Sequence, residues 1–164
     1  MDHLPTDDPR SKAQKAFDEA YRRQMDGDLD GAEALYKESI AHYPTAEAHT
    51  FLGWTYSGRD RLDEAIAECR KAIDVDPTFG NPYNDIGAYL LRQERVDEAI
   101  PWFQRALEAP RYESYCFPHM NLGRAWEAKR LWRRALAEYR KALVARPEYR
   151  PAREAAVRIL GFLN

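Results

Sequence analysis

Apolar and small residues return along this chain with the spacing of amphipathic helices. Residues 52–77 read LGWTYSGRDRLDEAIAECRKAIDVDP, in which apolar positions recur every three or four residues on both sides of a polar turn. Pro77 stands where the second helical run has to stop, because proline cannot continue a helix. The segment therefore predicts two helices joined by a short turn.

The same pattern occurs four times, at offsets of 33, 34 and 36 residues. Small residues recur where two helices must approach closely, large ones where a gap must be filled, and prolines at the ends. The corresponding sets are Ala20, Gly53, Gly87 and Gly123; Ala32, Ala65, Ala99 and Ala135; Tyr36, Cys69, Phe103 and Tyr139; Ser39, Ala72, Ala106 and Ala142; and Pro44, Pro77, Pro110 and Pro147. The copies are predicted at about 13–45, 46–79, 80–115 and 116–149.

This period and these residue types resemble the tetratricopeptide repeat family, whose unit is two antiparallel helices, A and B. The resemblance covers about residues 13 to 149. It implies an all-α fold, a right-handed α-α superhelix or solenoid of four helix pairs, with a concave groove lined by the A helices. It implies binding of a protein or peptide and does not imply a reaction.

The flanking segments complete the predicted architecture. Residues 1–8 are polar and read as a flexible tail, with Asp8 as a cap for a helix that begins at Pro9. Residues 150–163 read as a capping helix of one single domain, 9–164. Its predicted inner side consists of Ala152, Ala155, Ala156, Ile159 and Leu160.

Three irregularities interrupt the repeat. The turn of the third copy, Gln93-Glu94-Arg95, lacks a glycine, and Pro101 falls inside a predicted helix that it should bend or loosen. Two extra residues lie in the stretch 109–116. They predict either a longer loop or an extra half-turn before the next helix, or else an aromatic lip on the groove formed by Tyr112, Tyr115 and Phe117.

The family's ligand positions on each A helix give the candidate groove. The residues proposed to line it are Phe17, Tyr21, Thr50, Trp54, Asn84, Asp85, Leu91, Arg92, Phe117, Asn121, Arg124 and Arg158. Asn84 and Asn121 can each offer a donor and an acceptor to a peptide backbone, and the arginines can pair with acidic side chains. The aromatic residues would hold an apolar anchor, although Phe17 and Phe51 also suit a purely structural role between adjacent A helices.

One subtype of the family is excluded by its residues. Co-chaperones that hold the C-terminal carboxylate of Hsp70 or Hsp90 need lysine, arginine and asparagine at five fixed positions. Counted from the first copy, those positions hold Phe17, Tyr21, Phe51, Asn81 and Asp85; counted from the second, Thr50, Trp54, Asp85, Phe117 and Asn121. A weaker similarity is to bacterial pilus-biogenesis repeat proteins, but we see no lipoprotein signal.

No motif predicts a catalytic, cofactor or metal site. His3, His42, His49 and His119 have no partner at metal-ligand spacing, and no phosphate-binding glycine loop or nucleophile motif is present. Cys69 takes the place of a large buried residue, which favours an inert thiol over a disulfide or a nucleophile. The acidic pairs at 63–64 and 97–98 begin helices, where they favour the helix dipole.

Charge is distributed unevenly. Residues 1–115 hold 14 Lys+Arg against 23 Asp+Glu, whereas residues 116–164 hold 11 against 4. The groove residues lead us to expect a peptide-binding module first. The charge asymmetry suggests an alternative, a scaffold that self-assembles end to end through its acidic and basic halves. Nucleic-acid binding by the basic half is a third, less favoured reading. No run is long enough to enter a membrane, and a cytoplasmic location is the default.

Overall fold

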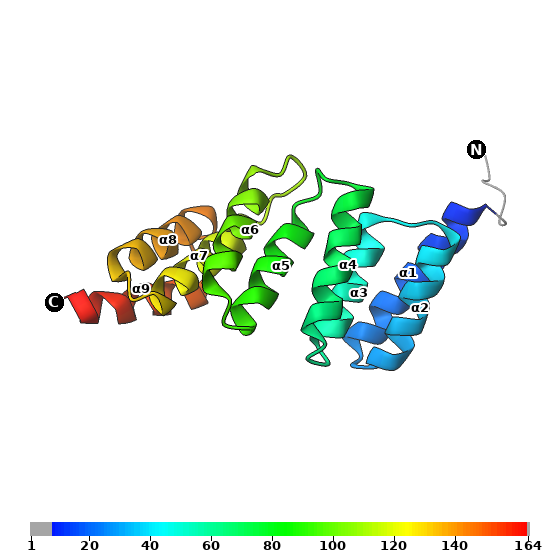
Figure 1. Cartoon of the computed structure of the whole chain (residues 1–164), viewed down its shortest axis with the longest axis horizontal. Coiled ribbons are helices and arrows are strands. Elements are labelled where there is room, and N and C mark those ends of the chain that lie inside the picture. The colour runs from blue at the N-terminus through cyan, green and yellow to red at the C-terminus, as the bar shows by residue number, and fades with distance from the viewer. Residues whose placement is uncertain (1–7, 164) are drawn as a thin grey trace. The chain divides into compact units, whose positions relative to one another are not determined.

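The computed structural model describes residues 8–163, and these are helical apart from their connections (Figure 1). The helices are α1 (Pro9–Met25), α2 (Leu29–His42), α3 (Ala46–Ser57), α4 (Leu62–Val75), α5 (Asn81–Arg92), α6 (Val96–Glu108), α7 (Cys116–Ala128), α8 (Trp132–Ala145) and α9 (Arg150–Leu163). Within that range, extended backbone pairs at one isolated bridge, between Phe79 and Arg111. The all-α prediction is confirmed. The predicted tail lies outside the described residues, except for Asp8.

The contacts of the chain divide it into two compact units. Unit 1 covers residues 1–77, with helices α1 to α4, and unit 2 covers residues 78–164, with helices α5 to α9. In each unit an A helix packs on the B helix that follows it, and the B helix packs on the next A helix (Figure 1). The boundary falls between the second and third repeats. A single domain over 9–164 stays a prediction.

Close approach of the A and B helices explains the paired small and large positions. A Cβ atom added at Gly87 would lie 2.5 Å from the ring of Phe103, and one added at Gly123 would lie 2.3 Å from the ring of Tyr139. Both rings are fully buried. The glycine of the A helix therefore makes the space that the aromatic side chain of the B helix fills, which is the core contact of these two repeats.

Side chains cap the starts of two helices in unit 1, α2 and α3. The Thr45 hydroxyl accepts a hydrogen bond from the backbone N–H of Ala48 at 3.1 Å, and the Asp28 carboxylate accepts one from Gly31 at 2.9 Å. The prediction for Asp8 was wrong in its mechanism. Helix α1 begins at Pro9 as expected, but the Asp8 side chain makes no capping hydrogen bond.

The turns from A to B helices share one backbone conformation. Gly27, Asp60, Glu94 and Arg130 occupy the same place in the four repeats, and all have positive φ, from 58° to 85°. Only the first is a glycine, the residue for which this conformation carries no steric cost. The turn of the third repeat is therefore formed without glycine, at the expense of local strain at Glu94.

We expect Glu94→Gly to stabilise the protein by about 0.5 to 1 kcal/mol. Glycine removes the steric cost of the left-handed backbone conformation, and this gain exceeds the larger conformational entropy that a glycine loses on folding. Glu94→Ala is the matched control, since it removes the same side chain but keeps a Cβ at φ 60°. Urea unfolding monitored by circular dichroism measures both. Equal midpoints for the two variants would contradict the assignment of strain to this residue.

The two extra residues before α7 form a loop that folds back onto the start of α5. The backbone N–H of Gly80 donates to the carbonyl of Arg111 at 3.1 Å, and the N–H of Arg111 donates to Thr78 at 2.9 Å. Tyr112 is buried against Gly80, where any Cβ would collide with it. The longer-loop prediction is therefore correct. The aromatic lip is wrong for Tyr112, whereas Tyr115 and Phe117 are exposed.

The last helix covers the apolar side of α7 and α8. Ala152, Ala155, Ala156 and Ile159 of α9 are buried in one cluster with residues of those helices. Leu160, which the sequence placed on the same side, is 39% exposed, so that part of the prediction was wrong. It follows Ile159 directly, at the edge of the stripe of α9 residues that are buried.

Candidate functional site

A cleft of about 570 Å³ lies on the A-helix side of unit 2. We call it the α5–α7 cleft, and its lining residues are Ala88, Leu91, Arg92, Glu94, Val96, Asn121, Arg124 and Ala128. Four of these are sequence-predicted groove residues, namely Leu91, Arg92, Asn121 and Arg124. The cleft combines an apolar floor with amide, guanidinium and carboxylate groups at its rim, as ligand pockets commonly do.

A chain of hydrogen bonds links the predicted polar groove residues. The guanidinium of Arg124 donates to Asn121 Oδ1 at 3.4 Å, and Asn121 Nδ2 donates to Asn84 Oδ1 at 3.1 Å. The Asn84 side chain in turn bonds Asp85. The two asparagines are thus partly engaged with each other, but each keeps one N–H and one lone pair for a ligand.

Asp85 is the unusual member of this chain. Burial raises the pKa of its carboxyl to about 7, and the hydrogen bond from Asn84 offsets this only in part. Tyr112, on the loop before α7, lies close enough for the charge of Asp85 to raise the tyrosine's pKa in addition to burial. Near neutral pH the carboxyl is therefore divided between its protonated and ionised forms.

The three predicted groove arginines differ in their availability. Arg158 on α9 is held by both carboxylate oxygens of Glu127 at 2.7 Å, and this interaction raises the arginine's pKa. Arg92 is exposed at the end of α5. Arg124 is exposed and, within residues 8–163, has no carboxylate at ion-pair distance. Arg124 is thus the cation of the cleft that is open to an acidic ligand group.

Aromatic side chains form a second candidate face, in unit 1. Phe51 of α3 makes edge contacts with Phe17, Tyr21 and Trp54 at centroid distances of 5.4, 5.7 and 5.8 Å. Tyr21 and Trp54 are 43% and 47% exposed, whereas Phe17 and Phe51 are half-buried. The two phenylalanines thus support the packing of α1 on α3, and the two exposed rings present apolar surface.

Two predicted site residues lie away from both faces. Thr50 is buried, and its hydroxyl donates to the carbonyl of Ala46 at 2.7 Å, so it offers no free group to a ligand. Phe117 packs edge-on against Tyr149 at 5.7 Å, beneath the guanidinium of Arg146. Neither residue lines the α5–α7 cleft.

Sequence reasoning missed a buried polar cluster that occurs in the second and fourth repeats. His49 Nδ1 lies 2.7 Å from Glu68 Oε2. The other carboxylate oxygen of Glu68, Oε1, accepts a hydrogen bond from Lys71 Nζ at 2.5 Å. The equivalent residues of repeat 4, His119, Glu138 and Lys141, make the same contacts. A histidine followed at 19 residues by a glutamate is the signal that could have revealed both clusters.

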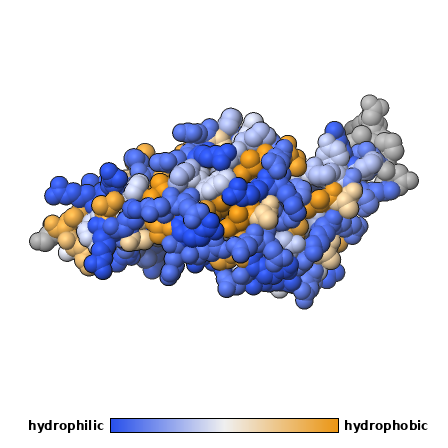
Figure 2. All heavy atoms as spheres, in the orientation of Figure 1, coloured by the Kyte–Doolittle hydropathy of each residue, from blue (hydrophilic) through white to orange (hydrophobic). Residues whose placement is uncertain are grey.

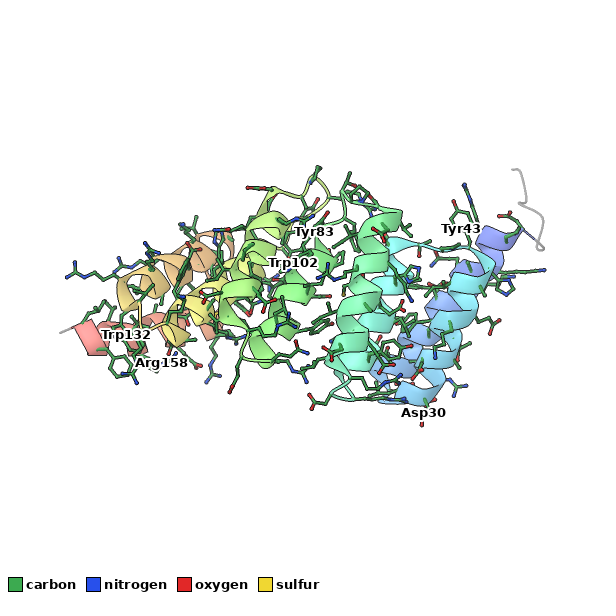
Figure 3. All side chains as sticks on the ribbon, viewed as in Figure 1. Asp30, Tyr43, Tyr83, Trp102, Trp132 and Arg158 are labelled. Atoms are coloured by element: carbon green, nitrogen blue, oxygen red, sulfur yellow. The ribbon has the colours of Figure 1, made fainter. Side chains whose placement is uncertain are left out.

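These clusters stabilise ionised carboxylates inside the fold. Burial by itself raises the pKa of Glu68, but the hydrogen bonds from His49 and Lys71 outweigh it, so the pKa lies below its usual value. Glu138 behaves in the same way. In repeat 3 the positions equivalent to the histidine and the glutamate hold Tyr83 and Trp102, whose rings lie together between α5 and α6 (Figure 3). The guanidinium of Arg105 lies over both rings.

Residues 8–163 hold no metal-binding cluster, membrane-spanning helix or disulfide. That part of the chain contains no group of three His, Cys, Asp or Glu side chains placed to hold a metal ion. None of its helices combines the length and apolarity that crossing a membrane requires. Both cysteines, Cys69 and Cys116, are buried, and neither forms a disulfide.

Comparison with known families agrees with the helix-pair architecture. The family model described as "Tetratricopeptide repeat" matches residues 17–78 and 83–114, more than half of the chain. The chain belongs to the tetratricopeptide repeat family. The matched segments fall on helices α1 to α6, which form the first three repeats, so the fourth repeat rests on its structure and on the spacing of its residues.

Individual relatives cover only part of the chain. The small glutamine-rich tetratricopeptide repeat-containing protein 2 of Mycosarcoma maydis is 26% identical over 105 residues, 63% of this chain and 30% of the relative. The SGT1 homolog of rice, Oryza sativa subsp. japonica, is 32% identical over 93 residues, 56% of this chain and 23% of the relative. The chain thus spans about a quarter to a third of the length of these relatives.

Solved structures are similar in fold. PilF of Pseudomonas aeruginosa has a TM-score of 0.88 at 19% identity, with 94% of this chain and 70% of that chain covered. The first tetratricopeptide domain of Spaghetti (RPAP3), solved with the HSP90 peptide SRMEEVD bound, has a TM-score of 0.67 at 23% identity, covering 73% of this chain and 93% of that chain. At these identities the likeness concerns the fold alone.

Proposed function

We propose that this protein is an interaction module that binds an extended peptide or a partner's helix on the A-helix side of its repeats. The α5–α7 cleft carries the proposal, because it joins an apolar floor to an exposed guanidinium and to asparagines with unused hydrogen-bonding capacity. That a related fold is known with a peptide bound supports the same reading. The proposal includes no catalytic step and no cofactor, and a cytoplasmic location stays a prediction.

The chemistry of the cleft supports a particular class of ligand. Leu91, Ala88 and Val96 favour an apolar side chain. Asn121 can hold the ligand backbone whatever its sequence, since backbone amides are common to all peptides. Arg124 adds a preference for one acidic side chain. The proposed ligand is therefore a segment with an apolar residue followed or preceded by an acidic one, in contact with α5 and α7.

Replacement of Asn121 and Arg124 separates backbone recognition from charge recognition. On a peptide array, Asn121→Ala should weaken many sequences alike, by about 0.5 to 1.5 kcal/mol for each hydrogen bond lost. Arg124→Ala should weaken only acidic ligands. Arg140→Ala is the control, because Arg140 is an exposed arginine on the B helix α8, outside the cleft.

The array contradicts the proposal in two cases. One is normal binding of every ligand by Asn121→Ala and Arg124→Ala. The other is loss of binding in Arg140→Ala, which would move the site to the B-helix side. Circular dichroism spectra of the three variants must match that of the native chain for the comparison to hold.

The charge asymmetry of the chain supports a second candidate function, end-to-end self-assembly. Residues 1–115 carry an excess of acid and residues 116–164 an excess of base, so two copies could attract each other head to tail. Sedimentation at low salt should then show oligomers that dissociate as the Debye length falls to about 8 Å, near 0.15 M salt. A monomer at every salt concentration would remove this candidate.

A further inference from the structure

The C-terminal end of unit 2 carries a hollow of about 400 Å³ that the function proposed above does not use. It lies between the start of α8 and the end of α9, and we call it the arginine-rimmed hollow. Its lining residues are Arg130, Leu131, Trp132, Arg133, Arg134 and Leu163. In Figure 3, Trp132 lies at the C-terminal end of the ribbon, close to the last turn of α9.

The floor of the hollow is apolar and exposed. Leu131 and Leu163 are 39% and 38% exposed, and the ring of Trp132 packs against Phe162 at a centroid distance of 5.3 Å, with the ring planes tilted by 32°. Phe162 itself is 62% exposed. Figure 2 shows hydrophobic surface at this end of the chain, beside strongly hydrophilic side chains. Leaving this much apolar surface in water has no benefit for folding.

The rim of the hollow is positively charged. Arg130, Arg133 and Arg134 are all exposed, and within the described part of the chain none has a carboxylate at ion-pair distance. The nearby carboxylates are engaged elsewhere, Glu127 with Arg158 and Glu138 with His119 and Lys141. The three guanidinium groups therefore form a local excess of positive charge.

Two of these arginines reverse the charge that helix stability favours. The first turns of α4 and α6 carry the acidic pairs Asp63-Glu64 and Asp97-Glu98, which suit the positive end of the helix dipole. The equivalent positions of α8 hold Arg133 and Arg134, and its first turn contains no acidic residue. Because this reversal weakens the helix start, the helix dipole does not explain it, whereas recognition of an anionic partner would.

We propose that the arginine-rimmed hollow binds a short acidic segment of a partner protein that inserts one large apolar side chain between Leu131, Trp132 and Leu163. The inserted side chain would bury the exposed floor, and acidic residues on either side of it would pair with Arg130, Arg133 and Arg134. Charge complementarity selects an acidic partner, and the concave apolar floor selects an anchor residue.

The shape of the hollow and the contacts of its aromatic rings favour an acidic protein segment over a nucleic acid or a membrane surface. A single-stranded nucleic acid needs aromatic faces open for base stacking, but the ring of Trp132 packs against Phe162 and the guanidinium of Arg134 lies over the ring of Trp126 at 5.1 Å. A membrane surface is contacted by protruding apolar side chains, and here they line a depression.

Fluorescence polarisation with labelled nine-residue peptides tests the proposal. The probe has a central Phe flanked by four Asp on each side, and its controls have Ala at the centre or Lys in the flanks. The native protein should bind the probe at least tenfold more tightly than either control. The double variant Arg133→Asp with Arg134→Glu should lose at least tenfold in affinity for the probe, while Arg140→Glu should change it less than twofold.

The double variant is also expected to remain folded, so that a loss of binding cannot be attributed to unfolding. It restores at α8 the acidic pair found at α4 and α6, so its melting temperature should equal or exceed that of the native chain. Arg124→Ala should bind the probe normally, which separates this site from the α5–α7 cleft. If Arg124→Ala alone lost the probe, the cleft would be the site and the present proposal would be wrong.

Other results would also overturn the proposal. They are equal affinity for the Phe and Ala peptides, unchanged binding in the double variant, or binding of a single-stranded oligonucleotide or of vesicles with an anionic lipid in place of the peptide. Salt-sensitive dimers of the native chain that disappear in the double variant, without peptide binding, would instead assign the hollow to a second copy of this chain.

Discussion

Removal of α9, from Arg150 onward, is expected to destabilise unit 2 by more than about 3 kcal/mol and to make the chain aggregate. The helix contributes Ala152, Ala155, Ala156 and Ile159 to the cluster that also contains Tyr139. Without it the apolar side of α7 and α8 is exposed to water, and the loss of one buried Ile side chain alone costs about 2 to 5 kcal/mol.

Single substitutions make the same test without truncation. Ile159→Ala should lower the free energy of unfolding by about 2 to 4 kcal/mol, because Ile159 is fully buried. Val157→Ala, two residues away and 65% exposed, should change it by less than about 0.5 kcal/mol. Chemical unfolding and light scattering measure the three chains. A truncated protein that remains monomeric with native stability would show that α9 does not act as a cap.

Asp85→Asn is expected to stabilise the protein by about 1 to 4 kcal/mol at pH 8 and to have little effect at pH 4. The folded carboxyl has its pKa raised to about 7 by burial, against an ordinary value of 3.8 in the unfolded chain. The folded state therefore holds the proton more tightly than the unfolded state. Stability due to this group is fully present below about pH 4 and is lost as the pH rises through 7.

The stability difference between variant and native protein isolates this effect from other titrations. Glu68 and Glu138 act with the opposite sign, because their lowered pKa values remove stability as the pH falls below their ordinary range. Asp26→Asn removes the same charge at an exposed position and is the control. A difference between Asp85→Asn and the native chain that stays constant from pH 4 to pH 8 would contradict the assignment of a raised pKa to Asp85.

The repeat spacing predicted the helix pairs, and the family resemblance that it supports implied the all-α fold. Helix ends are local events, set by the apolar period, by capping residues such as Thr45 and by prolines, so sequence carries them directly. The core positions follow for the same reason. A small residue such as Gly123 in an A helix and a large one such as Tyr139 in the next B helix must meet when the pair closes, whatever surrounds them.

The predicted groove residues differ in what surrounds them. Family positions identified Leu91, Arg92, Asn121 and Arg124, which do line one cleft. They also included Thr50, whose hydroxyl is turned back onto its own helix. Arg158 of the capping helix, which we added to these positions, is paired with Glu127. Whether a polar side chain faces a ligand or an internal partner depends on which groups its rotamers can reach, and sequence does not give those distances.

The sequence by itself determined the four helix pairs, the capping helix, the small and large positions of the core, and the charge difference between the two ends of the chain. The tertiary structure decided which polar groups pair. It joined Asn84 to Asn121 across α5 and α7, and His49 to Glu68 across α3 and α4. It also left the arginines at the start of α8 without a carboxylate at ion-pair distance among residues 8–163. Periodicity fixes which side of a helix is buried, whereas hydrogen bonds and ion pairs depend on distances of a few ångströms between side chains remote in sequence.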